Sequence, residues 1–314
     1  MFEWSEEHQM IREAVKRFVD DEIRPHVEEL EHGDLPPYDI IRKMLKTFGM
    51  DALARDRFAA TIAREKSLAE RNEAPVDKAG GSRGGDAGMS MIPTIELCRV
   101  CPGMVTAMGV SMGLASAAIM SKGTIAQKER WALDLMTMDK VGAWAITEPG
   151  SGSDAFGSMK STARRDGAKA TFMQERSGVA AMALGVIEEC LQLSVQYAKD
   201  RVQFGKPIGE FQLIQEKLAR MEVARLNVQN LVFRTIEMGS QGKLMTLAEA
   251  SAMKLYSARA AVEVAMEAVQ IFGGNGYMSE FRVEQLARDS KVLQIYAGTD
   301  EIQITHIAKD LLRR

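Results

Sequence analysis

A glycine- and serine-rich segment follows an apolar run near the middle of the chain. Residues 141–147 (VGAWAIT) predict a β-strand, and residues 149–153 (PGSGS) come directly after it. Such a loop exposes several backbone N–H groups and two hydroxyls, which suits it to a diphosphate or to the edge of a flavin. Alone the signal is weak, because most loops of this composition are only turns.

Two other spacings are less informative. Cys98 and Cys101 form a C-x-x-C without a second pair or a neighbouring histidine, so we expect two half-buried thiols and no metal site. Residues 79–88 (AGGSRGGDAG) have no strand before them and lack the G-x-G-x-x-G spacing of a dinucleotide site.

The elements that must position these residues are mostly helical. Ser5 suits a helix N-cap, and a helical pattern runs to about residue 31. Pro36 and Pro37 break it, and a second helix is predicted over 39–48. Residues 101–121 hold no charge and approach the length of a membrane span. Their Ala, Ser, Gly and Met content favours a buried helix instead, and purification without detergent would exclude the membrane alternative.

The second half of the chain predicts three long amphipathic helices in an antiparallel bundle. One begins near residue 174, and another begins at a capping box formed by Thr246 and Glu249. Short polar and C-terminal helices follow, over about 279–291 and up to 314. The apolar face of the first long helix contains Val179, Met182, Ala183, Val186, Cys190, Leu193 and Tyr197.

Composition indicates an ordinary globular protein. The 314 residues are 46% hydrophobic and 26% charged, with a net charge of −3. No basic stripe marks a nucleic-acid or anionic-membrane partner. Residues 1–7 are acidic and lack an apolar signal core, so we expect a cytoplasmic protein without a membrane span.

Four ordered segments resemble the signature segments of the acyl-CoA dehydrogenase family, over roughly residues 5–314. They are 144–154 (WAITEPGSGSD), 201–208 (RVQFGKPI, followed by Gln212), 270–277 (QIFGGNGY) and 294–303 (QIYAGTDEIQ). The resemblance implies a mainly α fold. An N-terminal helical domain (1–142) and a C-terminal antiparallel helical bundle (169–314) would enclose an abbreviated β module (143–168).

The resemblance also implies the chemistry, which belongs to fatty acid and lipid metabolism. A flavin oxidoreductase of this family removes the α-proton of an acyl-CoA and passes the β-hydride to N5 of FAD, leaving a trans-2-enoyl-CoA. Electrons then pass to an electron-transferring flavoprotein. We expect a homo-oligomer, either a dimer or a tetramer, with a hetero-oligomer as an alternative.

Residue by residue, the resemblance assigns a cofactor site. Its adenine and diphosphate end would cross to the neighbouring subunit of an oligomer. The positions that match are Trp144, Ile146, Thr147, Gly152, Ser153, Arg201, Phe204, Gln212, Gln270, Gly273, Gly274, Thr299 and Glu301.

The resemblance places the catalytic base at a different position from the one that many family members use. Ala297 stands where many members carry Glu, although its backbone N–H remains to bind the thioester carbonyl. Isovaleryl-CoA and long-chain acyl-CoA dehydrogenases instead place Glu before an Arg on the first bundle helix, which matches Glu175 and Arg176. A lone Glu at a helix start usually only compensates the helix dipole. The resemblance makes Glu175 the base.

The substrate contacts follow from the same alignment. Ser153, Arg176 and Gly298 would contact the acyl-CoA. A small-residue helix would form part of the acyl pocket wall, at Met108, Gly109 and Met112.

One region departs from the family pattern. Residues 158–167 lead almost directly into the helix that bears Glu175, so several dozen residues of the middle β domain are missing. The rival hypothesis is therefore a flavin-free, non-catalytic helical scaffold or partner subunit. A visible spectrum of the purified protein distinguishes the two.

Overall fold

The computed structural model describes residues 3–71, 86–148, 168–243 and 245–313. These residues are helical almost throughout, and their only sheet is a two-stranded hairpin. The prediction of a mainly α fold is confirmed. The domain limits at residues 142 and 168 stay a prediction.

The chain divides into two compact units. The bundle unit comprises residues 1–19, 82–102 and 172–314, and the second unit comprises residues 20–81 and 103–171.

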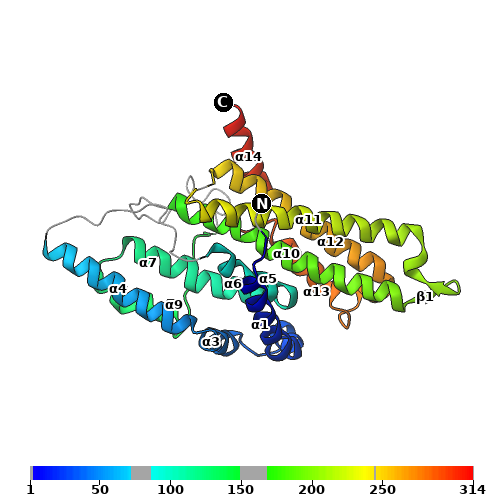
Figure 1. Cartoon of the computed structure of the whole chain (residues 1–314), viewed down its shortest axis with the longest axis horizontal. Coiled ribbons are helices and arrows are strands. Elements are labelled where there is room, and N and C mark those ends of the chain that lie inside the picture. The colour runs from blue at the N-terminus through cyan, green and yellow to red at the C-terminus, as the bar shows by residue number, and fades with distance from the viewer. Residues whose placement is uncertain (1–2, 72–85, 149–167, 244, 314) are drawn as a thin grey trace. The chain divides into compact units, whose positions relative to one another are not determined.

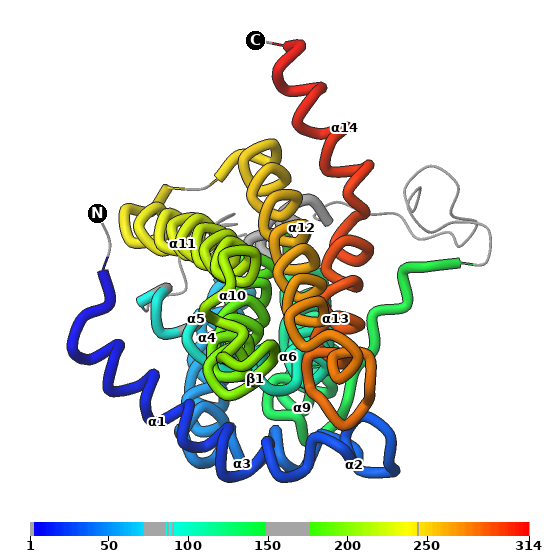
Figure 2. The backbone as a smooth tube through the Cα atoms, turned by 90° about the vertical axis from the view of Figure 1, so that its right-hand side faces the viewer, coloured from blue at the N-terminus to red at the C-terminus, as the bar shows by residue number. Residues whose placement is uncertain are grey.

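Three long helices form the framework of the bundle unit. They are α10 (Ala168–Asp200), α11 (Gln212–Ser240) and α12 (Leu247–Phe272), and they lie side by side (Figures 1 and 2). Two shorter helices, α13 (Val283–Val292) and α14 (Asp300–Leu311), pack against α12. Figure 2 shows α14 extending outward from the three long helices.

Helix α12 is the central element of this unit. The predicted capping box is present, with the Thr246 hydroxyl accepting from the Glu249 N–H and the Glu249 carboxylate accepting from the Thr246 N–H. Alanines and serines fill its buried face, and such small side chains let neighbouring helices approach closely. The helix ends at Phe272. Its C-cap Gly273 has φ +61°, which suits a glycine, and begins the 3₁₀ turn η5 (Gly273–Tyr277).

A tight hairpin joins α10 to α11. Strand β1 (Val202–Gln203) pairs antiparallel with β2 (Lys206–Pro207), and the 3₁₀ turn η4 (Ile208–Glu210) follows. The two residues between the strands, Phe204 and Gly205, have φ values of +52° and +83°. Two left-handed residues in a two-residue loop match the twist of the paired strands.

A buried ionic network links α1 (Glu6–Glu22) and α5 (Ala87–Val100) to α10. Glu96 accepts from Arg12 Nε at 2.6 Å and from Arg99 Nη1 at 3.0 Å. Arg99 Nη2 in turn donates to Glu189 at 3.1 Å. Charges enter a protein interior at tolerable cost only when they are paired in this way.

The second unit is built from helices of two separate segments, residues 20–81 and 103–171. Lys128 and Glu65 form a largely buried ion pair in it, with Nζ 2.7 Å from Oε2. Its elements are η1 (Arg24–His26), α2 (Val27–His32), α3 (Tyr38–Thr47), α4 (Met50–Glu70), α6 (Pro102–Met108), the π-helical turn η2 (Gly109–Ala115), α7 (Ser116–Lys122), α8 (Ile125–Gln127), the π-helical turn η3 (Lys128–Ala132) and α9 (Leu133–Met136).

Two expectations about secondary structure were wrong. The helix predicted over 5–31 is interrupted at Pro25, which lacks the N–H that an α-helix requires. Residues 141–147 form no strand, and only Glu148 makes an isolated bridge. A strand needs ladder hydrogen bonds to a neighbour, and no described segment pairs with 141–147. The strand predicted at 158–165 lies outside the described residues.

Within the part of the chain that the structure describes, two helical stretches are long and apolar enough to cross a membrane, Pro102–Lys122 and Gly178–Asp200. The core helix of a soluble protein meets the same criteria. In the second stretch 67% of the apolar window is buried inside the protein, against 22% in the first.

Candidate active site

The turn between α13 and α14 has a strained backbone. Ala297 has φ +53° and Gly298 has φ +88°, so both residues are left-handed. Glycine adopts this conformation freely, whereas an alanine pays about 1–2 kcal/mol for it. A residue held there needs surrounding structure that fixes it.

Four hydrogen bonds hold the two carbonyl oxygens of this turn. The Ala297 oxygen accepts from Arg176 Nε at 3.3 Å and from Gln303 Nε2 at 3.0 Å. The Gly298 oxygen accepts from the same Gln303 Nε2 at 2.7 Å and from Lys254 Nζ at 2.9 Å. The three donor side chains are all buried, and they come from α10, α12 and α14. The turn is therefore fixed from inside the bundle unit.

The carbonyl directions determine those of the adjoining amides. A trans peptide is planar, so its N–H points opposite to its C=O, and no described peptide is cis. The carbonyls of Ala297 and Gly298 face the buried donors. The N–H groups of Gly298 and Thr299 consequently face the other way. Amide donors fixed in this manner suit a developing negative charge.

The predicted base and its neighbour lie on α10. The side chain of Glu175 lies outside the described residues, although its main chain is helical. Arg176 is buried and also donates from Nη1 to the Ser251 hydroxyl at 3.0 Å. Helix α10 thus brings the main chain of residue 175 next to a side chain that binds the Ala297 turn. A CoA contact for Arg176 stays a prediction.

Charged groups surround the start of α14. Asp300 Oδ2 accepts from Arg259 Nε at 2.9 Å, while its Oδ1 lies 3.8 Å from Lys254 Nζ. Burial lowers the pKa of Lys254, and the nearby Asp300 opposes that shift. Thr299 is the N-cap of α14, and hydrogen bonds from the Glu301 N–H and the Thr299 hydroxyl lower the pKa of the exposed Glu301 carboxylate. The two predicted cofactor residues Thr299 and Glu301 therefore adjoin the turn.

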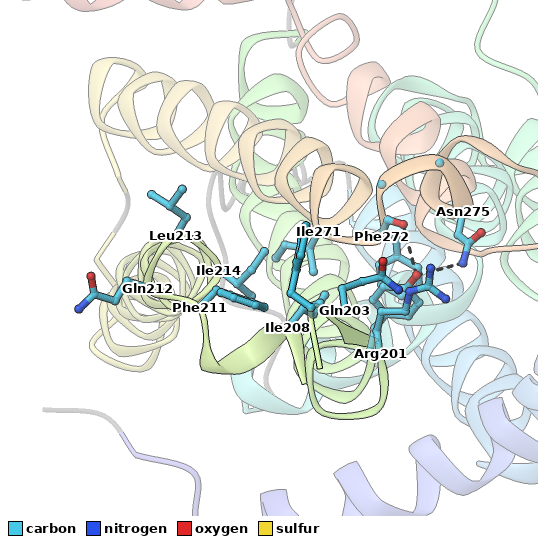
Figure 3. A pocket seen from close by; sticks show the side chains of 14 residues that line it. Arg201, Gln203, Ile208, Phe211, Gln212, Leu213, Ile214, Ile271, Phe272 and Asn275 are labelled. Carbon is cyan, nitrogen blue, oxygen red and sulfur yellow. Dashed lines mark hydrogen bonds between the residues drawn. The ribbon is translucent and has the colours of Figure 1, made fainter. Parts of the chain in front are cut away.

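A separate pocket of about 700 Å³ opens beside the β1–β2 hairpin in the same unit (Figure 3). Of the predicted cofactor residues, Arg201, Phe204, Gln212, Gly273 and Gly274 all line it, whereas Gln270 does not. In Figure 3, Arg201 and Gln203 lie near Phe272 and Asn275, while Gln212 lies at the far edge. The structure thus brings together residues about 70 positions apart in sequence.

The chemistry of this lining fits part of a nucleotide. Arg201 supplies a permanent positive charge for phosphate. A Cβ added at Gly273 or Gly274 would meet nothing within 4 Å, so their backbone is open to a ligand. The Phe204 ring is 94% exposed at the hairpin tip, where it is free to stack on a planar group. A dinucleotide such as FAD would find complementary groups here.

Sequence reasoning missed several residues of both sites. Tyr197 was predicted on a core face, but its ring stacks on Phe272 at 4.0 Å between centroids, and its hydroxyl accepts from Asn275 Nδ2 at 3.0 Å. Lys254 and Gln303 were not singled out either. Only their place within a matched segment could have identified Asn275 and Gln303. No sequence pattern marks Lys254 as buried.

The remaining predicted residues lie in the second unit. Trp144 and Ile146 are half-buried, in a segment without regular structure, and Thr147 is exposed. Gly152 and Ser153 lie outside the described residues. Met108 and Met112 are half-buried on α6 and η2, and Gly109 between them is exposed, with nothing within 4 Å of an added Cβ. Their place in the acyl pocket wall stays a prediction.

Comparison with known proteins identifies the family. Two family models match, the acyl-CoA dehydrogenase N-terminal domain over residues 5–139 and the acyl-CoA dehydrogenase C-terminal domain over residues 166–312. An acyl-CoA dehydrogenase of Bacillus subtilis is 29% identical over 397 aligned positions, covering 98% of each chain. Since this chain has 314 residues, at least 83 of those positions (397 less 314) have no counterpart in it.

Solved structures agree with that match. Butyryl-CoA dehydrogenase of Megasphaera elsdenii superposes with a TM-score of 0.77 at 25% identity, covering 99% of this chain and 100% of that one. A structure described under the electron transferring flavoprotein of Acidaminococcus fermentans, in work on flavin-based electron bifurcation, superposes with a TM-score of 0.75 at 23% identity and covers 100% of both chains. At that identity it supports the fold alone. The chain therefore belongs to the acyl-CoA dehydrogenase family and is an oxidoreductase acting on acyl-CoA, which confirms the resemblance of its motifs.

Proposed function

We propose that this enzyme converts an acyl-CoA to its trans-2-enoyl-CoA with FAD as oxidant and Glu175 as the base. The observation that carries the proposal is the hydrogen bond from Arg176 to the Ala297 carbonyl. It joins the helix segment bearing Glu175 to the turn that replaces the usual Glu-bearing loop. A base on α10 and amide donors on the turn would then act on the same substrate.

The chain's own groups would carry the proton chemistry. The α-proton of a thioester is weakly acidic, and its removal develops negative charge on the carbonyl oxygen. The backbone N–H of Ala297 would bind that oxygen, with the amides of the following residues beside it. Glu175 would accept the α-proton most effectively with a pKa raised toward neutrality by an apolar site.

The cofactor contacts are assigned from the same motifs. The residues that would hold the adenine and diphosphate end of FAD are Arg201, Phe204, Gln212, Gln270, Gly273 and Gly274. The 144–153 segment would line the flavin, and Thr299 and Glu301 would complete the site. When bound, the flavin supplies the acceptor for the β-hydride of the substrate. The exposed lining of the 201–275 pocket supports a ligand shared between two copies of the chain, and hence a homo-oligomer.

The partners are proposed from relatives. The butyryl-CoA dehydrogenase match favours a short acyl-CoA as first test substrate. An electron-transferring flavoprotein is proposed as the acceptor of the electrons. Gly298, Ser153 and Arg176 would contact the substrate, and Met108, Gly109 and Met112 would line the acyl chain. Cytoplasmic location stays a prediction.

The shortened middle of the chain favours one alternative. At least 83 aligned positions are missing relative to the B. subtilis enzyme. If those positions are needed to retain flavin, the protein is a flavin-free scaffold or partner subunit. Flavin absorbance in the purified protein, near one equivalent per chain, supports the enzyme. Colourless protein that does not take up added FAD supports the scaffold.

Replacing the proposed base provides the mechanistic test. Glu175→Gln keeps the shape of the side chain but cannot accept a proton, so turnover of butyryl-CoA with an artificial electron acceptor should fall about 10²- to 10⁴-fold. Flavin absorbance should stay unchanged. The matched control is Glu263→Gln, an exposed residue in the middle of α12, which should retain wild-type turnover. Near-full turnover in Glu175→Gln would remove this residue from the mechanism.

A further inference from the structure

Lys254 is completely buried in the middle of the bundle unit. Its exposed fraction is 0%, and it is the largest of the fully buried side chains described in this chain. Lysine is almost never buried to this extent without a partner, because an ammonium loses its hydration. Its position therefore calls for a specific interaction that offsets this cost.

The closest contact of the Lys254 ammonium is a backbone carbonyl. Nζ donates to the Gly298 oxygen at 2.9 Å, whereas the nearest carboxylate oxygen, Asp300 Oδ1, lies 3.8 Å away. The other oxygen of Asp300 accepts from Arg259 at 2.9 Å. An ammonium placed mainly for charge pairing would approach its carboxylate to about 2.7–2.9 Å. The geometry instead places the ammonium on the turn.

The bond to Lys254 complements the other contacts of the turn. Of the two turn carbonyls, Arg176 binds that of Ala297, and Gln303 divides one amide nitrogen between both. Lys254 thus gives the Gly298 carbonyl a donor of its own. A cation on this oxygen also polarises the peptide, which strengthens the N–H of Thr299 on its opposite edge as a donor.

We propose that Lys254 is a positioning residue, whose ammonium holds the left-handed turn at Ala297 and Gly298 so that its amide N–H groups face the thioester carbonyl. This inference rests on the proposed function. It adds a residue of α12 that touches neither substrate nor cofactor and acts through the main chain of the turn.

The test compares two ligands that differ only in the carbonyl. The probes are trans-2-butenoyl-CoA, a thioester of the product type, and S-(trans-2-butenyl)-CoA, the thioether of the same skeleton. Their dissociation constants are measured by isothermal titration calorimetry on the full-length oxidised protein. One well-formed hydrogen bond to the carbonyl should make wild type prefer the thioester about tenfold.

Removing the ammonium should abolish that preference selectively. In Lys254→Met we expect the two ligands to bind within about twofold of each other, because the turn no longer directs its amides. Lys254→Gln carries the same expectation and serves if the methionine variant does not fold. Lys128→Met is the matched control, since it removes another largely buried ammonium that does not contact the turn. It should keep the wild-type preference.

The outcomes separate the two proposals. A wild-type protein that does not distinguish thioester from thioether overturns carbonyl binding at the turn, and the role of Lys254 with it. A wild-type preference that survives unchanged in a folded Lys254→Met or Lys254→Gln protein overturns the positioning role alone. Loss of the preference in Lys128→Met as well would show a general effect of instability and would also overturn it.

Discussion

Two turns in the bundle unit share a left-handed backbone conformation but differ in how deeply they are buried. Ala297–Gly298 has φ values of +53° and +88°, and Phe204–Gly205 has +52° and +83°. Each places a non-glycine residue in the left-handed region, directly before a glycine. Ala297 is 7% exposed and its carbonyl is bound by two buried side chains. Phe204 is 94% exposed at the tip of a hairpin.

The difference shows how the two sites are completed. The closed turn at Ala297 is held entirely by side chains of its own unit, so the chain by itself can fix its amide donors. The open turn at Phe204 presents an aromatic ring outward beside a pocket of about 700 Å³. The backbone of the open turn is the one that a two-residue hairpin requires. The FAD proposed for this pocket would stack on the exposed ring and complete the site.

Removing an arginine side chain should lower the unfolding free energy far more at the closed turn of Ala297 than at the open turn of Phe204. Arg176→Met removes a charged, buried donor from the Ala297 carbonyl and from Ser251, and should cost about 2–4 kcal/mol of unfolding free energy. Arg201→Met, exposed beside the open turn, should stay within about 0.5 kcal/mol of wild type. Urea unfolding measures both. Equal losses of unfolding free energy in the two variants would show that the two turns are not held differently.

FAD affinity, unlike stability, should depend on the open turn of Phe204. Phe204→Ala removes a stacking surface and should weaken FAD binding about 10- to 100-fold, while the unfolding free energy changes little. Titration of apoprotein with FAD, followed by flavin fluorescence, gives the affinity. Tyr277→Ala, at an 83% exposed aromatic residue outside the lining of the 201–275 pocket, should bind FAD as wild type does. Unchanged affinity in Phe204→Ala would mean that the open turn does not hold the cofactor.

Relieving the backbone strain at Ala297 should give a smaller effect, an increase in unfolding free energy. Ala297→Gly places a residue that tolerates positive φ in the closed turn and should stabilise the protein by about 0.5–1 kcal/mol. Ala219→Gly, exposed inside α11, should destabilise by about 0.5–1 kcal/mol. Thermal unfolding of the pair provides the comparison. A destabilised Ala297→Gly variant would show that Ala297 is not strained.

The smallest expected effect is a pH dependence confined to the closed turn. Burial lowers the pKa of Lys254 from its ordinary 10.5, so the folded protein releases this proton at a lower pH than the unfolded chain does. The cost of burying the ammonium is therefore present at neutral pH and is relieved as pH rises through the folded pKa toward 10.5. Asp300, Arg176, Glu301 and Arg259 provide the surrounding charges.

Comparing the stability of wild type with that of Lys254→Met, which carries no charge at this position, isolates the free-energy cost of burying the ammonium. Wild type should gain unfolding free energy relative to Lys254→Met as pH approaches 10.5, in urea titrations at a series of pH values. A constant difference across that range would contradict a lowered pKa for Lys254.

The sequence supported much of the fold because the signals were local. Apolar spacing and the Thr246 capping box located the long helices, and the ordered motifs identified the family. Lys254 escaped notice because its burial depends on contacts between α12 and a turn more than 40 residues away. The strand expected at 141–147 failed for the complementary reason. Its apolar residues suit a strand, but a strand exists only with a partner.

Isotope exchange at the substrate α-carbon tests the central claim most directly, because it reports proton transfer without requiring turnover. Wild-type protein incubated with butyryl-CoA in D₂O should incorporate deuterium at the α-carbon, followed by mass spectrometry. Glu175→Gln should exchange at least about 100-fold more slowly, while Glu263→Gln should match wild type. Exchange by Glu175→Gln at the wild-type rate would contradict the account, because the base would then lie elsewhere.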